Sequence, residues 1–317
     1  MPKNKKDLRI IFLGNPEFAR FHLERILEEG YNVVAVISAP DRQGGRGMKM
    51  LSTPVTVYAK EKGIPCLQPK NLKNEEFQAE LKSYNADLQI VIAFRMLPIP
   101  VWDMPPLGTY NLHASLLPQY RGAAPINWAI INGETETGVS TFKLKHEIDT
   151  GNLLVQKACA IKPTENVGSL HDKLMHLGAD AIIETLEQLV TGNVNEIEQQ
   201  DSDTLKAAPK LFTDNTQIDW FKSGKDIINF IRGLSPYPVA HSMFDGKLLK
   251  VYEAEFTPLD HKITAGTFTS DGKSNLDVYT TDGIVSLLDI KLQGKRQMKI
   301  RDFLNGYDIS HLHITSV

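Results

Sequence analysis

The chain has 317 residues, which suggests about two domains, and 42% of them are hydrophobic, enough to bury full cores. Its formal charge of -3 excludes a global basic field for nucleic acid, so any such contact must come from local patches. Cys66 and Cys159 lie far apart and lack metal-ligand spacing, which argues against a disulfide framework and against a zinc site. The apolar run at residues 8–13 is too short for a signal peptide or a membrane span, so we expect a cytoplasmic protein.

The first part of the chain alternates predicted strands with predicted helices. Residues 8–14 form an apolar strand that ends in glycine, residues 16–29 form a helix, and residues 31–38 form a second strand. This order is typical of an α/β fold with a doubly wound, mostly parallel sheet and helices on both faces. The turn Gly14-Asn15-Pro16 lacks two glycines of the dinucleotide fingerprint, which argues against an NAD enzyme.

Residues 39–51 are predicted to form a loop that is rich in glycine and positively charged. Arg42, Arg46 and Lys49 lie in it, close to Gly44, Gly45 and Gly47. A mobile basic loop suits contact with phosphate groups. A solvated connector whose arginines bind nothing explains the same composition.

Further helices are expected at residues 53–62 and 75–83, and further strands at residues 64–67 and 87–94. The residues at the carboxyl end of the last strand are Phe94, Arg95, Met96 and Leu97. Ligands bind beyond such strand ends in open α/β sheets, so these residues are candidates for one wall of a crevice. Core packing of the three apolar side chains is the competing interpretation.

Residues 109–122 hold the strongest candidate for catalysis. A short strand with alternating polarity runs here into a loop, and residues two apart on a strand point the same way. Asn111 and His113 are therefore expected side by side, where an amide donor and an imidazole can polarise a carbonyl. Asp149 follows another predicted strand, and it can orient the His113 ring if the two strands are neighbours.

The rest of the chain suggests a second domain. Residues 125–131 and 167–190 predict helices, and residues 138–144 and 153–161 predict strands. The polar segment 193–210 reads as a linker between a domain at 1–192 and a domain at 211–317. Beyond it we expect one helix at 223–232 and short strands joined by turns at Asp245-Gly246 and Asp282-Gly283, which is typical of a small β-barrel.

Basic residues cluster near the end of this second domain. They are Lys291, Lys295, Arg296, Lys299 and Arg301. A solvated basic face is the ordinary explanation, and a nucleic-acid platform on the barrel is the alternative.

Three segments together resemble the formyl-tetrahydrofolate-dependent transferases, and the resemblance covers nearly the whole length. The segments are Asn111-Leu112-His113-Ala114-Ser115-Leu116-Leu117-Pro118, Tyr120-Arg121-Gly122-Ala123-Ala124-Pro125-Ile126 and Asp149-Thr150-Gly151. The resemblance is closest to the members that formylate the methionine carried by initiator tRNA. One departure is Phe94-Arg95, where that family commonly has Tyr-Gly.

The resemblance implies a Rossmann-like first domain, an OB-like second domain, 10-formyltetrahydrofolate as co-substrate and no metal. Its catalytic residues fall on Asn111, His113 and Asp149. Its folate contacts fall on Ser115, Leu116, Leu117 and Pro118, with residues 94–97 beside them. The tRNA contacts are expected from Arg42, Arg46 and Lys49, and from Lys291, Lys295, Arg296 and Lys299 on the barrel.

The implied reaction needs no nucleophile from the enzyme. The attacking amine has a reference pKa of about 7.7 to 8.0, so an appreciable minority is neutral at cytoplasmic pH. Asn111 and a protonated His113 are expected to donate to the oxyanion that forms, while Asp149 orients the imidazole. The protein is expected to act as a monomer.

Three alternatives stay open at this point. The first is a formyltransferase whose acceptor is a sugar amine or glycinamide ribonucleotide. The second is a hydrolase that releases formate from the same folate. The third, from another class, is a non-catalytic RNA-binding protein on the same fold.

Overall fold

The structure is a computed structural model of the whole chain, and it describes residues 4–44 and 49–309. The chain divides into two compact units. The first unit comprises Met1–Arg121, Gly138–Cys159 and Lys173–Lys206, and the second comprises Gly122–Thr137, Ala160–Asp172 and Ala207–Val317. The units are therefore interleaved along the chain. The prediction of a linker at residues 193–210 between a catalytic domain and a tRNA-binding domain concerns function, and it stays a prediction.

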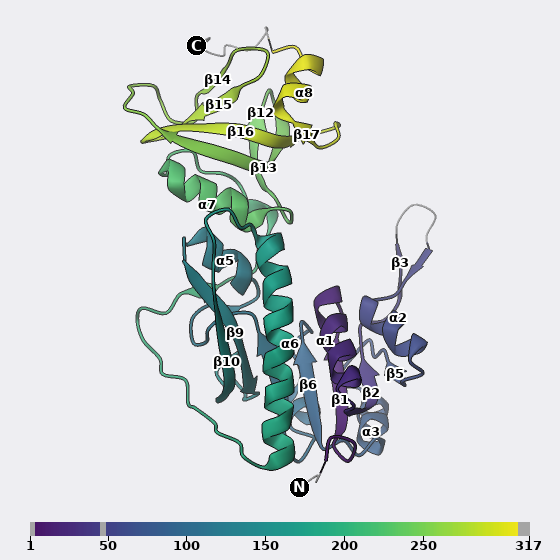
Figure 1. Cartoon of the computed structure of the whole chain (residues 1–317). Helices are drawn as coiled ribbons and strands as arrows, with labels where there is room; N and C mark the ends of the chain where they lie inside the picture. The colour runs from purple at the N-terminus through teal and green to yellow at the C-terminus, as the bar shows by residue number, and fades with distance from the viewer. Residues whose placement is uncertain (1–3, 45–48, 310–317) are drawn as a thin grey trace. The chain divides into compact units, whose positions relative to one another are not determined.

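A seven-stranded sheet forms the centre of the first unit (Figure 1). Its strands are β1 (Arg9–Gly14), β2 (Asn32–Ile37), β5 (Cys66–Leu67), β6 (Leu88–Ile92), β7 (Thr109–His113), β9 (Glu136–Lys143) and β10 (Leu153–Ala160). They lie in the order β10-β9-β7-β6-β1-β2-β5. From β7 to β5 all neighbours are parallel, and β9 is antiparallel to β7.

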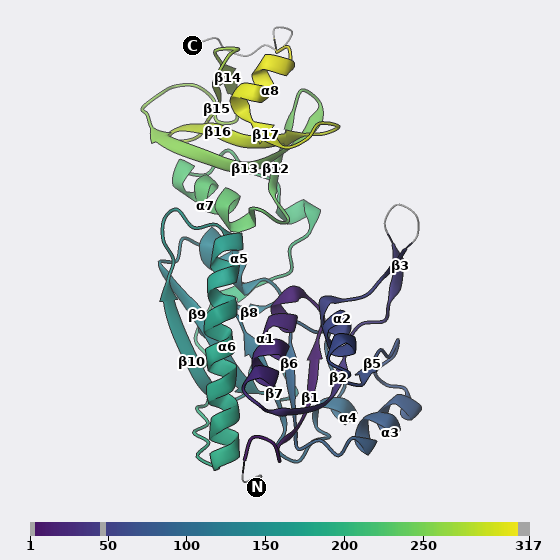
Figure 2. The same cartoon turned by 45° about the vertical axis from the view of Figure 1, so that its right-hand side comes forward.

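Helices cover both faces of this sheet. They are α1 (Glu17–Glu28), α2 (Pro54–Glu61), α3 (Glu75–Ser83), α4 (Ile99–Trp102) and α6 (Val167–Thr191) (Figure 2). Ile11 and Leu13 of β1 point to one face and pack in a cluster with residues of α3 and α4, such as Phe77. On the opposite face Gly178 of α6 lies against Leu112 of β7. The mostly parallel sheet with helices on both faces confirms the predicted α/β class. Burial of both faces also explains why the strands have near-continuous apolar sequences.

The predicted loop at residues 39–51 proved wrong in part, since it contains a short hairpin. Strand β3 (Arg42–Gly44) pairs antiparallel with β4 (Lys49–Leu51), with Arg42 opposite Leu51. Met50 and Leu51 are exposed, so these strands rest on no core and leave no alternation for a sequence pattern to detect. Arg46 lies outside the described residues.

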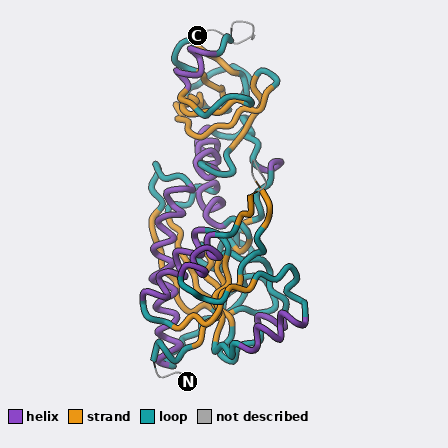
Figure 3. Tube along the Cα trace, turned by 90° about the vertical axis from the view of Figure 1, so that its right-hand side faces the viewer, coloured by secondary structure: helices purple, strands orange, loops and turns teal. Residues whose placement is uncertain are grey.

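The second unit contains an antiparallel, barrel-like sheet, as predicted (Figure 3). Its strands are β12 (Ala240–Phe244), β13 (Lys247–Pro258), β14 (Phe268–Ser270), β15 (Leu276–Tyr279), β16 (Gly283–Leu292) and β17 (Met298–Lys299). Asp245 and Gly246 both have positive φ, 51° and 66°, which is the backbone of a two-residue hairpin. The predicted turn between β12 and β13 is therefore confirmed.

Helices α5 (Pro125–Ile131), α7 (Gly224–Leu234) and α8 (Ile300–Gly306) also belong to the second unit. Helix α7 buries Ile227, Ile231 and Leu234 in the core of the sheet. The prediction of one helix in this region was wrong, because α8 packs Phe303 and Leu304 on the same core. The short elements that complete the description are β8 (Arg121–Gly122), β11 (Ala207–Ala208) and the 3-10 turn η1 (Thr213–Asn215). Across the described ranges, no helix has the length and apolar character needed to cross a membrane.

Candidate active site

The end of β7 presents the two polar residues that the sequence singles out. Asn111 is paired with Val91 of β6 and with Phe142 of β9, and His113 is paired with Ser140 of β9. Because they are two residues apart on one strand, their side chains leave the same face of the sheet. His113 is buried, with 6% of its surface exposed, while Asn111 is half-buried.

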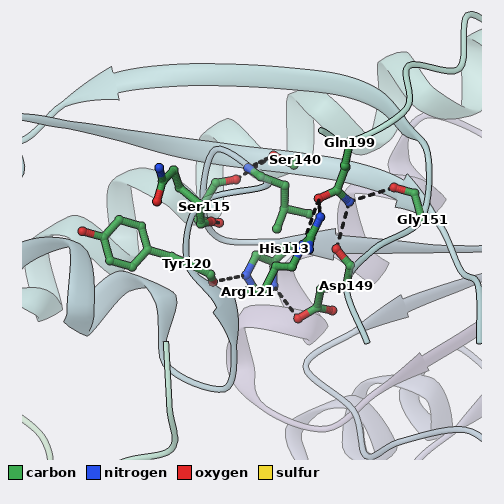
Figure 4. Close-up of polar contacts among 10 residues, drawn as sticks. His113, Ser115, Tyr120, Arg121, Ser140, Asp149, Gly151 and Gln199 are labelled. Carbon is green, nitrogen blue, oxygen red and sulfur yellow. Dashed lines mark hydrogen bonds and ion pairs between the residues drawn. The ribbon is translucent and has the colours of Figure 1, made fainter. Parts of the chain in front are cut away.

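The His113 imidazole is held from two sides (Figure 4). Its Nε2 lies 2.8 Å from the carbonyl oxygen of Tyr120. A carbonyl oxygen can only accept, so Nε2 carries the hydrogen and the tautomer is fixed by this bond. Its Nδ1 lies 3.8 Å from Oδ2 of Asp149, whose side chain is 12% exposed. The structure therefore brings together the imidazole and the carboxylate that the sequence places far apart.

Asp149 stands on a turn between β9 and β10 with a left-handed backbone, φ 56°. This conformation is uncommon for a residue with a side chain, so other contacts must hold it. Gln199 supplies two of them, because its Nε2 donates to the carbonyl oxygens of Asp149 and Gly151, each at 2.8 Å. A side chain at Gly151 would overlap the carbonyl oxygen of Lys143, so only glycine fits at that position of the turn.

Arg121 supports Gln199 from the other side. Its Nε and Nη2 donate to Oε1 of Gln199 at 3.1 and 2.9 Å, and its Nη1 donates to Asp201 at 2.7 Å. Arg121 belongs to one of the segments that carry the family resemblance, but no role was predicted for its side chain, and Gln199 was predicted to lie in a linker. No local pattern predicts the hydrogen bonds of these two side chains, because the bonds join segments about 50 to 80 residues apart in the chain.

The loop after β7 is fixed by hydroxyl groups. Ser115 is fully buried and its Oγ donates to the carbonyl of Gln119 at 2.6 Å. Ser140 Oγ donates to the carbonyl of Ser115 at 2.6 Å and accepts from the Leu117 amide at 3.0 Å. Leu117 is buried, whereas Leu116 and Pro118 keep part of their side chains accessible. Of the four predicted folate contacts, Ser115 and Leu117 therefore turn their side chains inward.

The residues that follow β6 divide in the same way. Leu97 is only 9% exposed and packs in the core, as the competing interpretation expects. Met96 is 73% exposed, and Phe94 is half-buried at the edge of the same core. The guanidinium of the exposed Arg95 donates to the carbonyl oxygens of Pro69 and Lys70.

The predicted tRNA contacts in the second unit are exposed, but they are not equally free. Lys291 lies directly opposite Lys250 across β16 and β13. Lys299 instead forms ion pairs with Glu253 at 2.6 Å and with Asp289 at 3.3 Å. The hydrogen bond to Glu253 raises the pKa of the Lys299 ammonium. Lys295, Arg296 and Arg301 are also exposed, as is Arg42 on β3 of the first unit.

Two family models match the chain. The model described as formyl transferase matches residues 8–186, and the model described as the formyl transferase C-terminal domain matches residues 210–308. In the part that the structure describes, no group of three or more His, Cys, Asp or Glu residues is placed to hold a metal ion.

Curated relatives are similar over almost the whole chain. The methionyl-tRNA formyltransferase of Bacteroides fragilis is 49% identical over 314 residues, which covers 96% of this chain and 97% of the relative. The methionyl-tRNA formyltransferase of Flavobacterium johnsoniae is 50% identical over 307 residues, with coverages of 96% and 97%.

More distant solved structures share the fold. HypX from Aquifex aeolicus in complex with tetrahydrofolic acid is 19% identical with a TM-score of 0.64, over 98% of this chain and 49% of that one. An N-formyltransferase from Helicobacter canadensis in complex with folinic acid and dTDP-3-aminofucose is 19% identical with a TM-score of 0.65, over 88% and 98%. The family models and the curated relatives together cover both units, and the chain belongs to the formyl transferase family.

Proposed function

We propose that this protein transfers the formyl group of 10-formyltetrahydrofolate to the α-amine of methionyl initiator tRNA. This proposal rests on sequence identity. The chain is 49% and 50% identical to two relatives named methionyl-tRNA formyltransferase, over 96% of this chain and 97% of each relative. The sugar N-formyltransferases of known structure are less than 20% identical to this chain. This similarity supports a shared fold, but it does not support a shared acceptor.

In the proposed reaction the amine nitrogen forms a bond to the formyl carbon, and the C–N10 bond breaks when the tetrahedral intermediate collapses. The Asn111 amide donates a hydrogen bond to the oxyanion. Asp149 holds the imidazole of His113 beside the reacting carbon, and His113 assists the transfer of protons from the amine toward N10. Support for these roles comes from the shared face of Asn111 and His113 and from the short separation of His113 and Asp149.

The folate is proposed to bind along residues 94–97 and 115–118, at the carboxyl ends of β6 and β7. Open α/β sheets bind ligands at such ends. Met96, with 73% of its surface exposed, offers an apolar surface to the pterin, and Leu116 and Pro118 offer accessible side chains. The buried Ser115 and Leu117 contribute by shaping the loop.

The tRNA is proposed to contact the hairpin of the first unit and the basic residues of the second. Arg42, Arg46 and Lys49 are assigned to phosphates near the acceptor end, and Lys291, Lys295, Arg296 and Lys299 to the stem. Like charges directly opposite each other destabilise a sheet, so the Lys250–Lys291 pair favours a polyanion as its partner. In this proposal residues 1–192 carry the chemistry, residues 211–317 hold tRNA, and the protein acts as a cytoplasmic monomer.

A transfer assay with labelled 10-formyltetrahydrofolate tests the acceptor. The purified chain is given methionyl initiator tRNA, a small amine sugar, glycinamide ribonucleotide or no acceptor. We expect rapid label transfer to the tRNA, and no comparable transfer to the small amines or release of formate. Preferential transfer to a small amine, or formate release without an acceptor, would replace the proposed function by one of those activities. Tight tRNA binding without any transfer would leave a non-catalytic RNA-binding protein.

A further inference from the structure

We infer that Gln199, in the segment predicted to be a linker, and Arg121, on β8, are positioning residues that set the geometry of His113 and Asp149. The inference rests on the proposed function, because it assigns these two residues a part in the same reaction. Neither side chain is proposed to touch the substrates. They act by holding in place the backbone at Tyr120 and at Asp149, the two residues that contact the imidazole of His113.

The Gln199 carboxamide uses its full hydrogen-bonding capacity. Its amide nitrogen has two hydrogens, which go to the carbonyls of Asp149 and Gly151, and its oxygen accepts two bonds from Arg121. With 9% of its surface exposed, the side chain is buried. A buried amide that makes four hydrogen bonds is held in one orientation, since any rotation would break some of them without replacement.

The two carbonyls belong to residues on either side of Thr150, so one nitrogen atom ties the turn together. This turn places Asp149 in the left-handed region, φ 56°, and aims its carboxylate at Nδ1 of His113. Without the two hydrogen bonds the turn is free to return to a more favourable backbone conformation. The carboxylate would then move away from the imidazole, because its direction is set by the backbone that carries it.

Arg121 extends the same support to the other side of the ring. It directly follows Tyr120, whose carbonyl accepts the hydrogen of His113 Nε2. The backbone amide of Tyr120 in turn donates to the carbonyl of Lys206 at 2.6 Å, so residues near 200 hold this segment twice. The bonds between Arg121 and Gln199 thus join the segment that holds Nε2 to the segment that holds Nδ1 (Figure 4).

Gln199→Glu is the sharpest test of this arrangement. The new carboxylate keeps its size and its pairing with Arg121, but it has no hydrogens for the two carbonyls of the turn. Gln78→Glu on α3 is the matched control. Gln78 is half-buried and also donates from Nε2 to a backbone carbonyl, that of Leu72 at 3.1 Å, but it lies in no part of the proposed site.

We expect Gln199→Glu to lower kcat about 10- to 100-fold, as a small displacement of reacting groups does, with both KM values changed less than about threefold. In an Asp149→Asn background the same substitution is expected to change kcat less than about threefold, because the carboxylate it positions is gone. Gln78→Glu should leave kcat unchanged. A wild-type kcat for Gln199→Glu, or an equal loss in both backgrounds, would overturn the inference.

Two further measurements keep the inference testable on its own. Should Gln199→Glu not fold, Gln199→Asn keeps the amide but withdraws it by one methylene, and the same loss and the same dependence on Asp149 are expected. The ring-nitrogen chemical shifts of His113 in ¹⁵N-histidine-labelled protein need no substrate. We expect Gln199 variants to shift them as Asp149→Asn does, and unchanged shifts would contradict the inference even if the chain acts on another acceptor. If the wild-type chain transfers no formyl group to the tRNA, the proposed function is refuted, but the inference about Gln199 is not.

Discussion

The backbone of Gly151 passes so close to the carbonyl oxygen of Lys143 that a side chain at residue 151 would overlap it. Lys143 is the last residue of β9, and Gly151 stands just before β10, so this approach closes the turn that carries Asp149. The position of the proposed catalytic carboxylate is therefore coupled to a glycine two residues away.

Gly151→Ala is expected to open this turn. Forcing a methyl group into a filled space typically destabilises a protein by about 1 to 3 kcal/mol, and the shifted Asp149 should lower kcat by about 100-fold. Thermal unfolding and steady-state transfer rates measure the two effects. Gly306→Ala is the control, because nothing lies within 4 Å of a β-carbon built there. Equal activity of the two variants would contradict the coupling.

Asp149→Asn replaces the carboxylate by a neutral group of the same shape. We expect kcat to fall by about 100- to 1000-fold with little change in KM, because the charge that faces Nδ1 of His113 is lost while the surface for substrates is kept. Steady-state kinetics with both substrates varied separates kcat from KM. A loss confined to KM would show that Asp149 binds substrate and does not assist the chemistry.

Arg42→Ala and Arg46→Ala should each raise the KM for charged tRNA without changing the KM for the formyl donor. Arg42 is exposed on β3, and a side chain that contacts a phosphate makes binding depend on salt. Titration between about 50 and 200 mM salt should show the slope of log affinity against log salt reduced by about 1 for each variant. Lys82→Ala, an exposed lysine on α3, serves as control. An unchanged slope would leave the hairpin as a connector.

Lys291→Ala should weaken tRNA binding more than Lys299→Ala does. Lys299 is already engaged by Glu253 and Asp289, whereas Lys291 faces the like charge of Lys250. Filter binding with uncharged initiator tRNA compares the two variants directly. A larger loss of tRNA affinity for Lys299→Ala would contradict this prediction. It would mean that Lys299 leaves its carboxylate partners to bind phosphate, and that the Lys250–Lys291 pair does not lie in the contact surface.

Burial lowers the pKa of His241, and the nearby charge of Lys250 lowers it further. The folded state therefore favours the neutral ring and binds fewer protons than the unfolded state. The stability that follows is present above the unfolded pKa of about 6.5 and is lost as the pH falls below it. Urea unfolding at about pH 7.5 and about pH 5.5 gives the free energy of unfolding at each pH. The decrease between the two pH values should be smaller for His241→Gln than for the wild type. The exposed His146→Gln should retain the wild-type difference, and an equally steep decline in His241→Gln would contradict the assignment.

The sequence predicted those parts of the fold and of the candidate site that follow from local periodicity or from turn residues. Asn111 and His113 share a face because strand side chains alternate, and the left-handed turn at Asp245-Gly246 follows from its two residue types. Gln199 could not be predicted, since an isolated glutamine in a polar segment has the composition of a linker. Its burial comes from contacts with Asp149, Gly151 and Arg121, which only the folded chain brings near.

Helix α8 was missed for a related reason. The basic residues around Lys299 and Arg301 were interpreted as a charged surface. The apolar residues Ile300, Phe303 and Leu304 belong to a helix of only about two turns, which gives a weak periodic signal. So short a helix is stabilised by its packing on the barrel core and not by its own propensity.

The central claim, that Asn111, His113 and Asp149 act together on the formyl carbon, is tested most directly by the single-turnover rate of Asn111→Ala. Enzyme in excess over methionyl initiator tRNA, with saturating 10-formyltetrahydrofolate, isolates the chemical step from binding and release. Loss of one oxyanion donor should slow this step by about 100- to 1000-fold, while the variant folds and binds tRNA as the wild type does. A rate within about threefold of the wild type, in a folded variant that binds both substrates, would contradict the claim.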